Sequence, residues 1–266
     1  MSHYGAIDEE LGDPALAGVA RATPRDLCQG LKILAVATWR QLGLGAGVGC
    51  QPSETTLTDN LLISLATLFR DRVIVRRTSQ RRERRIGSDF EVRFLDESRY
   101  VQLRLQAKRL DVPTQWYREF DKTARAVKQA RTLLAATPRW PALYCFYNHF
   151  DSRTLPELRT HEPTTLGVGL ADAREVLELL ECGGATLAEL LTLQAPWHQL
   201  VCSNGQESFD LLGEVTEFLF DLPGQGWDTQ PQDGGQDNHR AWVNGVDQVR
   251  DPALIARVLI GRVRNL

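Results

Sequence analysis

The sequence predicts an α/β or α+β fold built around one main domain. Segments with apolar residues at three- and four-residue spacing, typical of helices, alternate along the chain with short strand-like runs. Residues 88–108 show alternating apolar and polar side chains on both sides of a short polar turn, as in a β-hairpin. The 266 residues, 42% of them hydrophobic, suffice for one sizeable core, and no shift in composition separates two large domains.

The N-terminal part predicts two amphipathic helices. Residues 1–22 have no periodicity and are expected to form a loose lead-in. The first helix is predicted to begin with Thr23 as N-cap and Pro24 at the first helical position, and to end near Gln41, where a glycine-rich linker follows. The second helix is predicted over residues 53–71, with a serine cap at its first residue.

Strands and helices are expected to alternate through the rest of the chain. A short strand over 73–78 is expected to lead into an arginine-rich loop. Beyond the hairpin, the pattern predicts a helix over 115–136, strands over 141–150 and 166–171, and helices over 173–181, 185–194, 207–221 and 252–263. We therefore divide the chain into a core at 23–200 and a helical C-terminal extension at 201–266, whose polar stretch 224–238 is expected to be a mobile loop.

The composition argues against several protein classes. The net charge of −3 argues against a protein that coats DNA non-specifically. The five cysteines are scattered and include no Cys-x-x-Cys pair, so we expect reduced, mostly buried thiols and neither a zinc ribbon nor a disulfide scaffold. No apolar run is long enough to span a membrane, and the N-terminus lacks the features of a secretory signal, so a cytoplasmic location without a membrane partner is expected.

The two faces of the predicted hairpin differ in chemistry. If residues 96–99 form the turn, the numbers of directly opposed residues sum to 195, which places Asp89 opposite Gln106 and Lys108 one diagonal step away. The polar face then consists of Asp89, Glu91 and Arg93 on the first strand and Gln102, Arg104, Gln106 and Lys108 on the second.

This polar group suits metal-assisted hydrolysis of phosphodiesters. Mg²⁺ favours oxygen ligands, which Asp89 would offer as a carboxylate, Gln106 as an amide oxygen and Ala107 as a backbone carbonyl. Lys108 would orient the attacking water and stabilise the charge that develops on the phosphate. The alternative is that the polar face is solvated, held by cross-strand ion pairs and without function.

Several motifs resemble the PD-(D/E)XK nuclease superfamily, in which an Asp on one core strand is followed on the next by Glu/Gln-x-Lys. The motifs are G-S-D-F-E-V at 87–92 and L-Q-A-K at 105–108, and E-T-T-L-T-D-N-L-L at 54–62 and Y-C-F-Y-N at 144–148 are similar to an uncharacterised bacterial group within it. The resemblance covers about residues 25–200. It implies a restriction-endonuclease-like mixed sheet flanked by helices, with additional C-terminal helices, and a nuclease dependent on Mg²⁺ or Mn²⁺.

The resemblance also implies roles for individual residues. Asp89 would be the principal metal ligand, Lys108 the catalytic lysine and Gln106 the replacement for the usual acid, a version found in active nuclease domains of phage-defence and restriction systems. An acid from the helix ahead of the sheet would be Glu54, with Asp59 as a weaker candidate. Glu91 would serve as a second carboxylate, and Gln129 is either an auxiliary polar residue or an exposed helical side chain.

Arginines and aromatic residues flank this motif. Trp116 and Tyr117 either stack on a base or belong to the core. The arginines are expected to hold phosphates at the rim of the site, although a basic run is often only a solvated loop. They are Arg76, Arg77, Arg81, Arg82, Arg84 and Arg85.

Three functional hypotheses follow. The first is a metal-dependent nuclease acting on DNA in phage defence, restriction or repair, as a homodimer or with a protein partner from the same system. The second is a non-catalytic module on the same fold that binds nucleic acid or protein through the arginines. The third is an interaction protein whose polar hairpin face is merely solvated.

Overall fold

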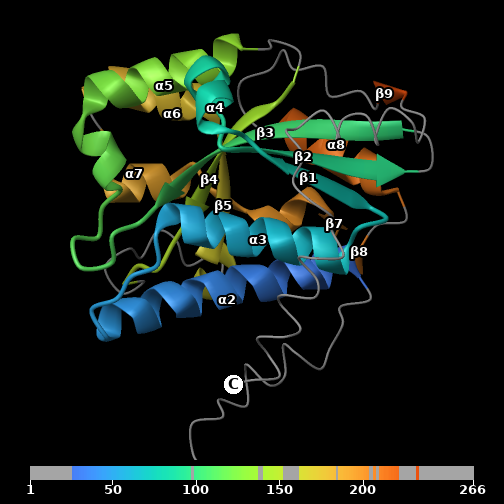
Figure 1. The fold of residues 1–266 in the computed structure, drawn as a ribbon, viewed down its shortest axis with the longest axis horizontal. Helices are drawn as coiled ribbons and strands as arrows, with labels where there is room; N and C mark the ends of the chain where they lie inside the picture. The colour runs from blue at the N-terminus through green and yellow to red at the C-terminus, as the bar shows by residue number, and fades with distance from the viewer. Residues whose placement is uncertain are drawn as a thin grey trace, which may run out of the picture.

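A mixed β-sheet with helices on both faces forms the centre of the computed structural model (Figure 1). The structure describes residues 26–96, 99–136, 140–151, 162–183, 185–203, 206–207, 210–221 and 232–233. Six strands follow one another across the sheet: β1 (Val73–Arg77), β2 (Phe90–Asp96), β3 (Arg99–Arg109), β4 (Ala142–Tyr147), β5 (Val168–Asp172) and β6 (Ala195–Pro196). Only β3 and β4 are parallel, and all other neighbours are antiparallel. The predicted α+β class, with a mixed sheet flanked by helices, is confirmed.

The register of the hairpin is the predicted one. Phe90 pairs with Leu105 and Asp96 with Arg99, so opposed residue numbers sum to 195. The apolar face of the hairpin packs into the main core, as alternation requires. Its polar face is also buried, because Glu91, Arg104, Gln106 and Lys108 are each at most 2% exposed. The alternative of a solvated polar face is therefore wrong.

Three helices form the layer on this apolar face of the sheet: α3 (Glu54–Leu68) and α8 (Leu211–Asp221) pack against the hairpin, and α2 (Leu27–Gly47) lies beside α3 and over β5. The opposite face of β4 and β5 is covered by α5 (Thr123–Ala135), α6 (Ala173–Glu181) and α7 (Leu187–Thr192). Figure 1 shows α2 and α3 on one side of the sheet and α5 and α6 on the other. The remaining elements are the helix α4 (Gln80–Ile86), the 3-10 turns Arg118–Asp121, Pro163–Gly167 and Trp197–Leu200, and the short strands β7 (Cys202–Ser203), β8 (Gln206–Glu207) and β9 (Gln232–Asp233).

The first helix differs from its prediction at both ends. Its N-cap is Asp26, whose side chain accepts a hydrogen bond from the Gln29 backbone N–H at 2.7 Å. The helix does not stop near Gln41 but continues through most of the glycine-rich segment to Gly47. Tertiary packing outweighs the low helix propensity of glycine there, because a Cβ at Gly43 would lie 2.3 Å from the His149 ring.

Two other elements also differ from their predictions. The arginine-rich segment expected to be a loop contains the helix α4, which ends at Gly87 in the left-handed conformation with φ 69°. The helix expected over 115–136 begins only at Thr123, because Trp116 pairs with Asp111 in an isolated bridge and a 3-10 turn follows.

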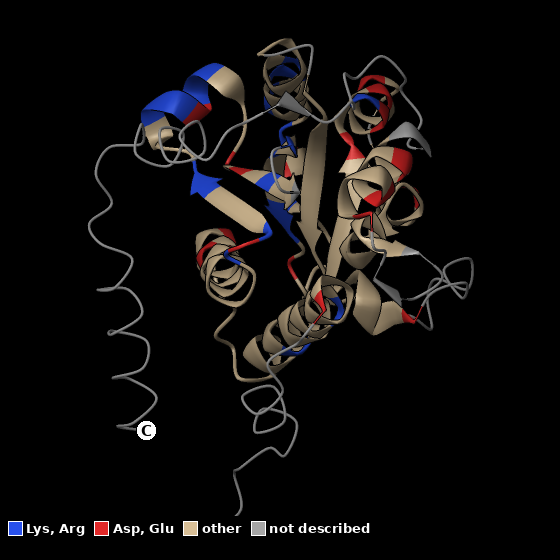
Figure 2. Ribbon diagram, turned by 90° about the vertical axis from the view of Figure 1, so that its right-hand side faces the viewer, with Lys and Arg blue, Asp and Glu red and all other residues tan. Residues whose placement is uncertain are grey.

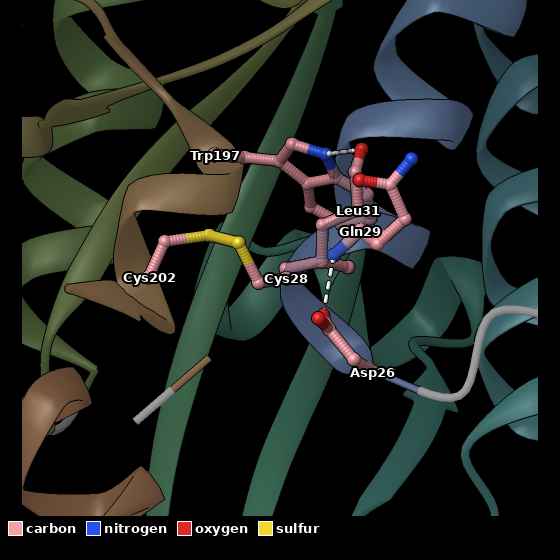
Figure 3. The surroundings of a disulfide bond; sticks show 6 residues. All are labelled: Asp26, Cys28, Gln29, Leu31, Trp197 and Cys202. Atoms are coloured by element: carbon pink, nitrogen blue, oxygen red, sulfur yellow. Dashed lines mark hydrogen bonds between the residues drawn. A yellow bond between two sulfur atoms is a disulfide. The ribbon is translucent and has the colours of Figure 1, made fainter. Parts of the chain in front are cut away.

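A disulfide joins Cys28 on α2 to Cys202 on β7 (Figure 3). The expectation that all five thiols are reduced is therefore wrong for this pair, and of the three free cysteines only Cys145 is buried. Nearby, the Trp197 indole N–H donates to the Leu31 backbone carbonyl at 2.7 Å. Both contacts tie the region around residue 200 to the first helix.

Residues beyond 200 contribute to the same core. Leu212 and Val215 of α8 belong to the cluster that contains the apolar face of the hairpin. Within the stretch expected to be a mobile loop, β9 pairs with the first residues of β3. The expected lead-in at 1–22, the cap at Thr23 and Pro24, and the helix at 252–263 lie outside the described residues, as does most of 224–238. No helix in the described part of the chain is long and apolar enough to cross a membrane.

Candidate metal centre

Asp89 stands where α4 turns into the sheet. Gly87 permits this turn, because α5 approaches so closely that a Cβ at Gly87 would lie 2.7 Å from the Leu133 backbone nitrogen. The backbone of Asp89 is held on both sides: its N–H donates to Leu105 at 2.9 Å, and its carbonyl accepts from Thr78 at 2.7 Å. The Asp89 side chain therefore starts from a fixed position at the beginning of β2.

Gln106 and Ala107 on β3 meet the Asp89 carboxylate. The Ala107 N–H donates to Asp89 Oδ2 at 2.7 Å, and the Gln106 amide nitrogen donates to the same oxygen. The Gln106 amide nitrogen also lies 3.3 Å from the Ala107 carbonyl oxygen. The predicted opposition of Asp89 and Gln106 is thus present, with the Ala107 carbonyl beside it.

Glu54 and Lys108 complete the group electrostatically. Burial raises the pKa of Asp89 to about 6, although the charge of Lys108 and the Ala107 N–H act to lower it. Burial likewise raises the pKa of Glu54 to about 7, with Lys108 lowering it and Asp89 raising it. Both carboxyls therefore sense the charge of Lys108, and Glu54 also senses that of Asp89.

Two oxygen atoms in this group are buried without a hydrogen-bond donor: Glu54 Oε2 and Gln106 Oε1. Buried acceptors normally have a partner, so such atoms call for a ligand that accepts lone pairs. A hard divalent cation is such a ligand, and two carboxylates, an amide oxygen and a carbonyl fit its preference for oxygen. Within the described ranges, no group of three or more His, Cys, Asp or Glu side chains is arranged to hold a metal, so this site depends on Gln106 and the backbone.

Glu91 belongs to a different cluster. It is fully buried and ion-paired with Arg76, with Arg82 at 3.0 Å and with Arg104 at 3.5 Å. Its expected role as a second carboxylate at the metal centre is not supported, because the arginines occupy both of its oxygens.

The six candidate arginines separate into two groups. Arg76 and Arg82 contact Glu91. Arg77 pairs with Asp59 at the surface, and its charge also acts to lower the pKa of Asp89. Arg81, Arg84 and Arg85 are exposed on α4. Figure 2 shows basic residues along α4 and at the adjoining end of β1.

The remaining candidates lie near the group or in the core. The Gln129 backbone carbonyl on α5 would lie 3.0 Å from a Cβ at Gly87, so this residue is close to the start of β2. Trp116 packs on the core between β4, β5 and the helices α5, α6 and α7, and it donates its indole N–H to Asp121 at 2.7 Å. Tyr117 is fully buried and donates to Asn148, which places it in the core and not at a surface for stacking bases.

Tyr144 entered the sequence analysis only as part of the Y-C-F-Y-N motif, with no role at the metal centre. Its hydroxyl is buried without a hydrogen-bond partner; burial raises its pKa well above the ordinary value, and the charge of Asp89 raises it further. Tyr144 pairs with Gln106 in the parallel β3–β4 register, which brings it onto the polar face. No pattern in the sequence predicts that Tyr144 lies beside Gln106, because this pairing joins two parallel strands that are separated by a helix.

Sequence comparisons place the chain among its relatives. No curated protein matches it. A family model described as a family of unknown function (DUF6615) matches residues 27–263, which include the hairpin, all helices of the described core and the region beyond residue 200. The chain therefore belongs to the DUF6615 family.

Proposed function

We propose that this protein is a divalent-metal-dependent nuclease that hydrolyses phosphodiester bonds in DNA. The observation that carries the proposal is the group of the partly buried Asp89 and Glu54 with the buried Gln106 and Lys108, in which two buried acceptor oxygens lack donors. A lysine beside two partly buried carboxyls and unpaired oxygens is the chemistry needed to hold a cation and a reacting phosphate together.

Each residue has a distinct role in this proposal. Asp89, Glu54, the Gln106 amide oxygen and the Ala107 carbonyl would hold Mg²⁺ or Mn²⁺. The cation, when bound, supplies Lewis acidity for the phosphate and a more acidic water. Lys108 donates hydrogen bonds to the attacking water or to the phosphate oxygens, and its burial at 2% exposure strengthens these interactions. Exposed arginines on α4 add salt-dependent attraction to the substrate backbone.

A second candidate is a non-catalytic module that binds nucleic acid. It is favoured by Gln106, which takes the place of an acid and leaves two carboxylates in the group. This module would retain affinity for nucleic acid in EDTA and would cleave nothing when a metal is added.

The test is cleavage of plasmid, linear duplex, single-stranded DNA and RNA with Mg²⁺, Mn²⁺ or EDTA. We expect metal-dependent cleavage of DNA that Asp89→Ala and Lys108→Ala each reduce by at least about 100-fold. Matched controls are Glu181→Ala and Lys128→Ala, which remove exposed side chains of α6 and α5 and should retain activity within about twofold. Cleavage that persists in both site variants, or that EDTA does not affect, would refute the proposal.

A further inference from the structure

The polar side chains on one face of the β2–β3 hairpin form a row, which continues beyond the candidate metal centre into an arginine cluster. Arg104 is two residues from Gln106 on β3, and Glu91 is two residues from Asp89 on β2, on the same face of the sheet. A strand advances about 3.3–3.4 Å per residue, so this cluster lies roughly 7 Å along the strands from the centre.

The cluster contains more donors than it can satisfy internally. The one carboxylate, Glu91, faces the three guanidinium groups of Arg76, Arg82 and Arg104. Arg104 is 2% exposed; its Nε lies 3.5 Å from Glu91 Oε1, whereas its Nη1 is buried without a hydrogen-bond partner. Its stacking over the Trp140 ring, 4.9 Å from the ring centroid, offers a π-face and no hydrogen-bond acceptor.

Gln102 adds a donor of the same kind. Arg93 Nε donates to Gln102 Oε1 at 2.8 Å, which fixes the orientation of the amide. The Gln102 amide nitrogen is then buried without an acceptor, on a side chain that is 3% exposed. Unsatisfied buried donors next to surplus positive charge are costly, and an anion with several oxygens relieves both.

We propose that Arg104, Arg82 and Gln102 form a phosphate-binding subsite next to the candidate metal centre. The ligand class is a phosphodiester group of the strand whose neighbouring phosphate lies at the metal centre, so the identity of the ligand rests on the proposed function. Planar guanidinium groups bind phosphate oxygens through paired hydrogen bonds. Arg82, whose side chain is 32% exposed, is the member of the cluster that reaches the surface, and it meets an incoming phosphate first.

The subsite is tested by binding without metal. The anisotropy of labelled 12-nucleotide strands of DNA and RNA, and of a 12-base-pair duplex, is measured against full-length protein in EDTA at several salt concentrations. We expect Arg104→Gln and Arg82→Gln to weaken binding by about tenfold or more and to lower the salt slope by about one. Arg131→Gln removes the same charge from an exposed pair on α5 and should change affinity less than twofold.

Thermal melting of every variant accompanies the binding measurement. If Arg104→Gln does not fold, the affinity of Arg82→Gln decides whether the subsite exists, because the Arg82 side chain is partly exposed. Arg104→Lys is a further variant, which keeps the positive charge but removes the planar guanidinium group. Wild-type affinity in a folded Arg104→Gln or Arg82→Gln protein, or no binding by the wild type at low salt, would overturn the subsite.

The subsite and the nuclease proposal can fail separately. Binding in EDTA that depends on Arg104, without any metal-dependent cleavage by the wild type, supports the subsite and overturns the nuclease. Metal-dependent cleavage with an unchanged KM in Arg104→Gln supports the nuclease and overturns the subsite.

Discussion

Two neighbouring regions of one polar row, around Asp89 and around Glu91, are built alike but differ in what they leave unpaired. Both lie on the polar face of the hairpin, and both place one acid opposite a residue of β3, but Glu91 is fully buried whereas Asp89 is only partly so. Around Asp89 the unpaired atoms are the acceptors Glu54 Oε2 and Gln106 Oε1 and the Tyr144 hydroxyl, which can accept as well as donate. Around Glu91 they are donors, on Arg104 and Gln102.

The difference indicates what each region is built to bind. Buried acceptors without donors favour a cation, and buried donors without acceptors favour an anion. A cation beside a bound phosphate chain is the arrangement required for phosphodiester chemistry. The sign of the unpaired atoms therefore distinguishes two regions that look the same as a sequence pattern.

The largest expected effect comes from neutralising the acid that the arginines enclose. Glu91→Gln leaves three guanidinium groups without their carboxylate, and breaking a buried ion pair costs about 3–5 kcal/mol of unfolding free energy. Urea unfolding measures this loss, with Glu217→Gln on the exposed side of α8 as control. A Glu91→Gln protein as stable as the control would contradict the view of Glu91 as a structural counter-ion.

A smaller effect is expected from metal at the other region. Mg²⁺ or Mn²⁺ at about 100 times its Kd should raise the unfolding free energy by about 2.7 kcal/mol in the wild type. The rise in Tm should disappear in Asp89→Ala and remain in Arg82→Gln, because only the first variant removes a proposed ligand. Equal stabilisation of all three proteins would show that the cation binds elsewhere.

The smallest effect concerns pH in the absence of metal. The folded pKa of Glu54 is about 7, above its ordinary value of 4.5, so the folded state binds the proton more tightly than the unfolded state. The contribution of Glu54 to stability is fully present below pH 4.5 and is lost as the pH rises towards 7. At about 1.4 kcal/mol per pKa unit, and after allowance for partial exposure, the unfolding free energy falls by about 2 kcal/mol. Urea unfolding in EDTA at pH 5 and pH 8 should show this loss in the wild type, with a shallower decline in Glu54→Gln. Identical pH profiles would mean that Glu54 is not buried as described.

Local patterns were sufficient to predict much of the candidate site. Alternation and turn length predicted the hairpin register, because a shift of one residue would have moved every apolar side chain of one strand to the polar face. Ser53 capped the second helix as its type predicts, accepting a hydrogen bond from Thr56 at 3.0 Å. Asp89, Gln106 and Lys108 therefore came together on one face by local rules alone. The first helix, in contrast, extended through glycines that propensity alone would make its end.

What the sequence by itself determined was the hairpin register, which of its side chains share a face, and the order of most elements, though not the helix α4. Only the tertiary structure decided that both faces of the hairpin are buried and that three arginines form ion pairs with Glu91. It also placed Tyr144 on the polar face and joined Cys28 to Cys202 in a disulfide. The physical reason is range: capping and alternation act over a few residues, whereas burial and ion pairing depend on segments that approach only when the chain has folded. Cys28 and Cys202, separated by 174 residues, are the clearest case.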